Sequence, residues 1–117
     1  MKHTQQQIAT LFSNGDFEET FPYLSADVIW NVVGENQFQG KPAVVNNCQQ
    51  TLAYFKSVET KFITEDVIVA ENRVVIRGSG EFIREGKRVN FILACDVYEF
   101  SDEGKLEKIT SYCIPES

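Results

Sequence analysis

Histidine and cysteine, which supply most zinc ligands and many nucleophiles, are scarce in this chain. The 117 residues include one histidine, His3, and three cysteines, Cys48, Cys95 and Cys113. These positions do not have the ligand spacing of a zinc site, so we expect no metal, and we expect no other cofactor. An odd number of dispersed cysteines predicts reduced thiols and a cytoplasmic location, with disulfides as the less favoured alternative.

Long apolar runs and basic stripes are missing as well. No window approaches the roughly 20 apolar residues of a membrane span, and residues 1–7 lack an apolar signal segment. Acidic residues scattered through the chain give a formal net charge of -6, which makes nucleic acid and anionic membranes poor partners. Gly78-Ser79-Gly80 lies inside a predicted strand with no helix after it, so it does not form a phosphate-binding loop. The length fits one domain, residues 1–117, with a core of its own.

The beginning of the chain carries helix signals. Thr4 followed by Gln7 is a capping-box pattern that opens a short amphipathic helix, which Asn14-Gly15 ends. Asp16 predicts the start of a second helix, and Pro22 should shorten or distort that helix because proline breaks the backbone ladder.

Changes in periodicity predict the remaining elements. Residues 28–33 are β-branched and aromatic and predict a first strand, followed by a polar loop to Gly40. Pro42 suits the first turn of the longest helix, predicted at residues 42–57. Alternating apolar residues then predict strands, joined by short turns, at residues 59–70, 73–84, 88–101 and 105–114. Helices followed by a meander of long strands predict an α+β fold, with the helices packed on one face of a curved antiparallel sheet.

The third of these four strands contains a carboxylate in the middle of an apolar run. Alternation sends Asp96 to the same face as Ile92, Ala94, Tyr98 and Phe100. Burying a charged aspartate costs several kcal/mol. Asp96 should therefore be protonated, well hydrogen-bonded or exposed to a cavity that admits a ligand. A structural aspartate, held by backbone donors or at a strand irregularity, is the alternative.

The neighbouring strand sharpens this hypothesis through its register. A two-residue turn near residues 85–87 would place Arg77 and Glu81 on the face of Asp96, whereas a three-residue loop groups these exposed-type side chains on the other face. We prefer the three-residue loop, which opposes Ile76 to Asp96, Gly78 to Ala94, and Gly80 to Ile92. The small residues would then leave a hollow beside the carboxylate, although strand glycines also mark bulges and sharp bends.

Four short segments, in order along the whole chain, resemble those of a known family: Asn14-Gly15-Asp16-Phe17, Leu24-Ser25-Ala26-Asp27-Val28-Ile29-Trp30, Gly40-Lys41-Pro42-Ala43-Val44 and Tyr98-Glu99-Phe100-Ser101-Asp102-Glu103-Gly104-Lys105-Leu106. The chain is similar to the nuclear-transport-factor-2-like superfamily, in particular its SnoaL-like and ketosteroid-isomerase-like bacterial proteins. The resemblance implies a cone-shaped, curved antiparallel sheet with three helices from the N-terminal half on its concave face, around an apolar pocket. It also implies a homodimer through the outer sheet face. It does not determine activity, because isomerases, cyclases, hydrolases and non-catalytic binders share this fold.

The resemblance to the isomerases is partial at the level of single residues. Asp96 matches an aspartate that, when neutral, donates a hydrogen bond to the substrate oxyanion. Asn31 stands where the isomerases have a general base, and Ile8 where they have an oxyanion-hole tyrosine. An amide cannot abstract a carbon-bound proton at neutral pH, which disfavours the isomerase mechanism. Ring closure of the polyketide-cyclase type would use Asp96 as general acid or base, with Asn31 and Tyr98 orienting a carbonyl or enolate.

Three functions therefore remain open. The main hypothesis is a domain that binds a small apolar or ring-containing molecule in a pocket that contains one buried carboxylate. The alternatives are a cofactor-free cyclase- or isomerase-type enzyme that uses Asp96, and a non-catalytic dimeric interaction protein. Such a dimer would cover the apolar outer face of Phe91, Leu93, Cys95 and Val97. A second proton-transfer group in the pocket would favour the enzyme. We expect ligand contacts from Asn31, Tyr98, Cys48, Gly78, Gly80, Phe82, Ala94, Phe12 and Val33.

Overall fold

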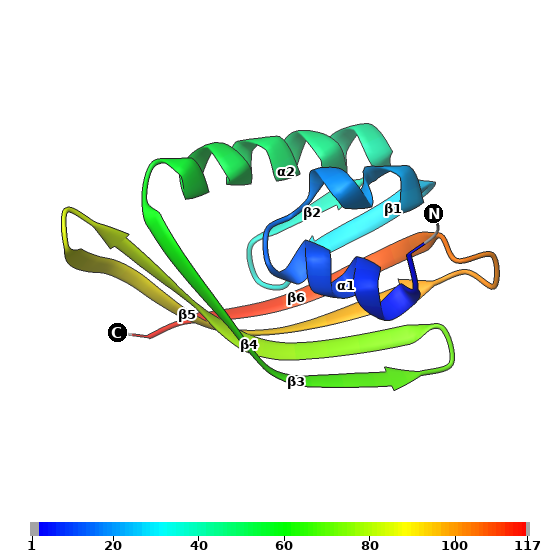
Figure 1. Cartoon of the computed structure of the whole chain (residues 1–117). Helices are drawn as coiled ribbons and strands as arrows, with labels where there is room; N and C mark the ends of the chain where they lie inside the picture. Colours follow the sequence, from blue (N-terminus) through cyan, green and yellow to red (C-terminus); the bar gives the residue numbers. More distant parts are fainter. Residues whose placement is uncertain (1–2, 117) are drawn as a thin grey trace.

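A computed structural model describes residues 3–116 and contains one six-stranded sheet with helices on its concave side (Figure 1). The helices are α1 (Gln5–Ser13), the 3-10 helix η1 (Glu18–Tyr23) and α2 (Lys41–Lys56). The strands are β1 (Leu24–Val32), β2 (Asn36–Gln39), β3 (Glu59–Ala70), β4 (Arg73–Arg84), β5 (Lys87–Phe100) and β6 (Leu106–Pro115). Their order in the sheet is β2-β1-β6-β5-β4-β3, and every neighbouring pair is antiparallel except β1 with β6. The predicted α+β fold is confirmed.

The helix signals at the beginning of the chain act as predicted. In α1 the Thr4 hydroxyl accepts a hydrogen bond from the backbone N–H of Gln7 at 3.1 Å, and the Gln7 side chain accepts one from the backbone N–H of Thr4 at 2.8 Å. This capping box satisfies N–H groups that have no partner within the helix. The second helix is distorted, as Pro22 predicts: it is a 3-10 helix that begins at Glu18 instead of Asp16.

The structure differs from the prediction near the first strand. β1 begins at Leu24 instead of residue 28, and β2 occupies a segment that was predicted to be a loop. β2 lies at the edge of the sheet and exposes Asn36, Gln37 and Gln39. Its sequence lacks the usual alternation of apolar and polar residues because only one of its side chains, Phe38, packs against the core. Pairing with β1 therefore decides its conformation.

The predicted register between β4 and β5 is confirmed, but the turn that produces it is different. Asp96 pairs with Ile76, and the other two predicted pairs also form. The turn is a two-residue loop, Glu85-Gly86, in which both residues have positive φ (52° and 77°), as a type I′ hairpin requires. One extra residue of β5, Val89, then forms a bulge and moves the side chains back into the predicted alternation.

Gly78 explains how this sheet bends. β3 has a register shift between Thr64 and Asp66, directly beside Gly78 of β4. A Cβ atom on Gly78 would lie 2.2 Å from the carbonyl oxygen of Ile63, so only glycine permits this close approach of the two backbones. The bend curves the sheet around the helices and makes room for a cavity.

The hydrophobic core fills the space between the sheet and the helices. α1 contributes Ile8 and Phe12, α2 contributes Val44 and Cys48, and Tyr98 of β5 is fully buried in the same core. The three cysteines are free thiols, in agreement with the prediction. Among residues 3–116, none of the helices has the length and apolar character that crossing a membrane requires.

Candidate functional site

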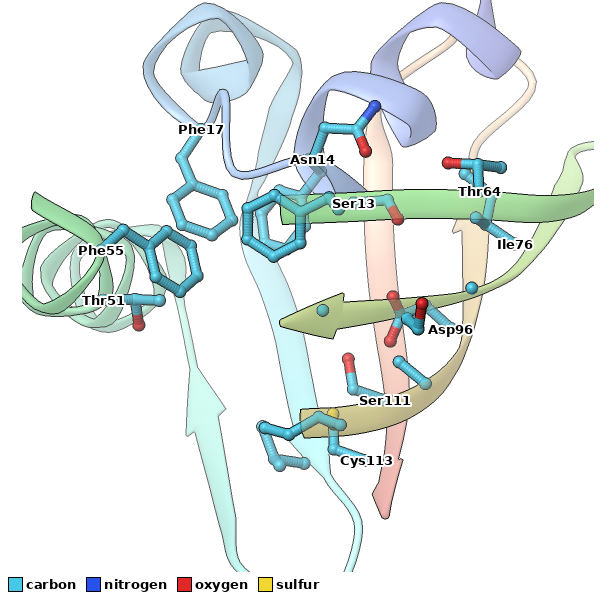
Figure 2. Close-up of a pocket in the computed structure, with 18 of the residues that line it drawn as sticks. Ser13, Asn14, Phe17, Thr51, Phe55, Thr64, Ile76, Asp96, Ser111 and Cys113 are labelled. Carbon is cyan, nitrogen blue, oxygen red and sulfur yellow. The ribbon is translucent and has the colours of Figure 1, made fainter. Parts of the chain in front are cut away.

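A pocket of about 350 Å³ lies between the concave face of the sheet and the helices (Figure 2). This volume falls within the roughly 300 to 1,000 Å³ that is typical of small-molecule sites. Most of its wall is apolar, and much of that wall is aromatic. The aromatic lining residues are Phe12, Phe17, Trp30, Tyr54, Phe55, Phe62, Phe82 and Tyr98.

Asp96 lies in the wall of this pocket. In the sheet it has Ile76 of β4 on one side and Ser111 of β6 on the other. The expectation of a buried carboxylate is wrong, because Asp96 is partly exposed. The physical reason is that the cavity reaches the middle of β5, so the side chain faces open space instead of packed atoms.

Hydrogen bonds to Asp96 come from neutral donors. The Tyr98 hydroxyl donates to Oδ2 of Asp96 over 3.3 Å, and the Ser111 hydroxyl also donates to this carboxylate. The indole Nε1–H of Trp30 donates to Oγ of Ser111 over 2.9 Å. An indole N–H can only donate, so it leaves the proton of Ser111 available for Asp96. Ser13 of α1 in turn donates to Tyr98, which completes a chain of hydroxyls that ends at the carboxylate.

The surroundings shift the pKa values of these groups. Partial burial removes water from the Asp96 carboxylate and raises its pKa, and the hydrogen bonds from Ser111 and Tyr98 oppose that rise. Burial also raises the pKa of Tyr98 well above its usual value, and the nearby Asp96 adds to the shift, so Tyr98 remains a donor at neutral pH. Burial raises the pKa of Cys113, another lining residue, to about 11. Asp96 is the only carboxyl group of the described pocket wall.

The structure brings most of the predicted site residues together. Seven of them line the pocket: Asp96, Tyr98, Gly78, Gly80, Phe82, Ala94 and Phe12. Asn31, Cys48 and Val33 do not. Asn31 pairs with Thr110 in β6, and alternation along β1 points Trp30 and Val32 into the pocket instead.

Cys48 and Val33 miss the pocket for different reasons. Cys48 packs in the core beneath α2, where burial raises the pKa of its thiol to about 12 and makes it unreactive. Val33 follows the end of β1 and is 41% exposed. With Asn31 on the outer side, none of the described lining residues is a second carboxylate or a histidine.

Several lining residues were not among the expected ligand contacts, although two signals in the sequence indicate them. Trp30 and Val32 share a face of β1, and Ser111 lies opposite Asp96 in the β5–β6 hairpin. On α2 the pocket face lies beside the core face, and Phe55 belongs to both. The residues of the pocket face, at helical spacing, are Asn47, Thr51, Tyr54 and Phe55.

The sequence pattern of the SnoaL-like domain matches residues 5–110. The chain belongs to the SnoaL-like domain family. No curated protein sequence matches this SnoaL-like domain significantly. The family membership agrees with the resemblance that the sequence segments predicted.

Solved structures share the fold of this SnoaL-like domain. An NTF2-like protein of unknown function from Cytophaga hutchinsonii is 34% identical, with a TM-score of 0.82 over 92% of this chain and 93% of that one. An LEH-like epoxide hydrolase from M. tuberculosis is 16% identical, with a TM-score of 0.72 over 94% and 82% of the two chains. A provisionally named SnoaL-like polyketide cyclase from Shewanella denitrificans is 16% identical, with a TM-score of 0.73 over 94% and 90%. The last two support the fold only.

Proposed function

We propose that this SnoaL-like domain binds a small, mainly apolar, ring-containing molecule in the pocket, with Asp96 as its principal polar contact. One observation carries the proposal: a pocket of ligand size has an aromatic wall and a single carboxylate that hydroxyl donors hold in place. Small-molecule sites commonly combine an apolar surface with a few placed polar groups.

A thermal-shift screen against ring-containing ketones, phenols and polyketide-like lactones tests this proposal. A ligand at 100 times its Kd should raise the free energy of unfolding by about 2.7 kcal/mol, because it binds the native state alone. Asp96→Asn should weaken the response to every hit. Ala94→Leu should abolish it, because Ala94 lines the pocket and the larger side chain fills it.

Leu93→Ala is the matched control for the pocket variant. Leu93 is adjacent in β5 but points to the outer face and is 44% exposed, so its truncation should leave ligand binding unchanged. If a hit produces the same thermal shift in Asp96→Asn, Ala94→Leu and Leu93→Ala, it binds outside the pocket, which would contradict the proposal.

An acid–base enzyme is the second candidate. The raised pKa of Asp96 favours it, since a general acid or base works best when its pKa lies near the operating pH. Two fold relatives carry enzyme names, an epoxide hydrolase and a provisionally named polyketide cyclase. Each hit should therefore be incubated with the protein and followed by mass spectrometry. Turnover that falls by roughly 10² to 10⁴ in Asp96→Asn would support this candidate over simple binding.

A homodimer through the outer sheet face is part of the same proposal. Leu93 pairs with Ile114 across β5 and β6, and Tyr112 lies next to them, with exposures of 44%, 63% and 46%. Such adjacent apolar side chains favour contact with a second copy. Light scattering should give twice the chain mass of 13.3 kDa, and Leu93→Lys should give a monomer. Gln37→Lys, on the exposed edge strand, is the control, and a monomeric wild-type protein would refute the dimer.

A further inference from the structure

We propose that the pocket takes a protonated amine that carries one or more rings, with its ammonium group paired to Asp96. This inference rests on the proposed binding function and narrows the ligand to one chemical class. Its first support is charge. Among the described residues of the pocket wall, Asp96 is the only acidic residue, and there is no lysine, arginine or histidine. No cation of the protein therefore neutralises the carboxylate from within the pocket, and none is placed there to attract an anionic ligand.

The partners of Asp96 suit its ionised form. Tyr98 and Ser111 both donate to the carboxylate, and the Trp30 indole fixes the direction in which Ser111 donates. Hydrogen bonds to the charged form stabilise it relative to the neutral acid. The carboxylate keeps accessible surface toward the cavity, where an ammonium group can donate further hydrogen bonds.

Aromatic rings occupy the side of the pocket away from Asp96. Figure 2 shows Phe17 and Phe55 across the cavity from the carboxylate. Phe55 stacks on Phe17 with a centroid distance of 6.2 Å and on Phe82 with one of 5.7 Å. Rings at this end of the pocket can pack against the rings of a ligand whose ammonium group lies at Asp96.

The C-terminal end of α1 adds to the negative electrostatic potential of the pocket. Ser13 and Asn14, at its C-terminus, line the pocket. The C-terminus of a helix carries a partial negative charge, and α1 has no basic residue in its last turn to offset it. The carboxylate and the helix end thus both favour a positive ligand and disfavour an anion.

The test uses three compounds with one skeleton: 4-phenylbutylamine, 4-phenyl-1-butanol and 4-phenylbutyrate. The chain has one tryptophan, and Trp30 lies in the pocket wall, so its fluorescence reports binding directly. At about pH 8 an alkylamine is still protonated. We expect the amine to bind wild type about tenfold more tightly than the alcohol, as a charge-assisted hydrogen bond implies, and the carboxylate least of all.

Two variants then distinguish amine binding at Asp96 from general attraction to the acidic protein surface. Asp96→Asn should bring the amine and the alcohol to equal affinity, whereas Glu107→Gln, an exposed charge outside the pocket wall, should change neither. In wild type the amine should also bind more weakly as pH falls through the pKa of Asp96, while the alcohol does not. Tyr98 and Cys113, the other titratable groups near Asp96, stay neutral over this range.

Each outcome decides between the two proposals. Amine preference that depends on Asp96 supports the inference. If the alcohol binds as tightly as the amine, or the preference survives in Asp96→Asn, the inference fails while the proposed binding function stands. If neither these compounds nor the neutral ring compounds of the thermal screen bind, both fail.

Discussion

Gly78→Ala should lower the free energy of unfolding by about 3 kcal/mol or more. The new Cβ meets backbone atoms, which cannot rotate away as a side chain can. The new Cβ would lie 2.2 Å from the carbonyl oxygen of Ile63 and 3.2 Å from its carbonyl carbon. β3 and β4 would have to separate at the bend that shapes the pocket. Urea unfolding measures the loss, and a Tm decrease of roughly 10 °C should accompany it.

Two nearby variants should lose less stability than Gly78→Ala. At Gly80 a Cβ would meet the Phe62 ring at 3.2 Å, and a ring can shift where a carbonyl cannot, so Gly80→Ala should cost less. Ser79→Ala, between the two glycines, adds no atom and should stay within about 0.5 kcal/mol of wild type. Equal stability of Gly78→Ala and Ser79→Ala would show that β3 and β4 are not held this close together.

Protonation of Asp96 should make wild type more stable, relative to Asp96→Asn, as pH falls. The raised pKa of Asp96 means that the native state binds this proton more tightly than the unfolded state does. This stabilisation by the bound proton is fully present below the pKa that Asp96 has in the unfolded state. It is lost as pH rises through the pKa that Asp96 has in the native state. Within that window the stability difference between the two proteins should change by up to about 1.4 kcal/mol per pH unit.

Urea unfolding between about pH 4 and 8 measures this difference, because other carboxylates cancel between the two proteins. Tyr98→Phe removes one of the hydrogen bonds that lower the pKa of Asp96, so it should extend the window to higher pH. Glu107→Gln, exposed on β6, should follow wild type at every pH. A difference that is flat, or that grows in favour of wild type with rising pH, would show that the pocket does not raise the pKa of Asp96.

The sequence alone determined most elements of this fold. Local signals were sufficient where they agree with the tertiary structure: the capping box of Thr4 and Gln7, Pro22 in a distorted helix, and the alternation of β3, β4, β5 and β6. Alternation also identified the face of Asp96, because a strand has only two faces. These signals act over a few residues, so no knowledge of distant contacts was needed.

Only the tertiary structure decided how the site is assembled. The parallel pairing of β1 with β6 brings Trp30 next to Ser111, and the cavity leaves Asp96 partly exposed. β2 has no local signal of its own, and Asn31 faces outward although a resemblance of sequence had suggested a place in the site. These properties depend on which distant residues meet, and a sequence pattern that repeats over two to four residues carries no information about such meetings.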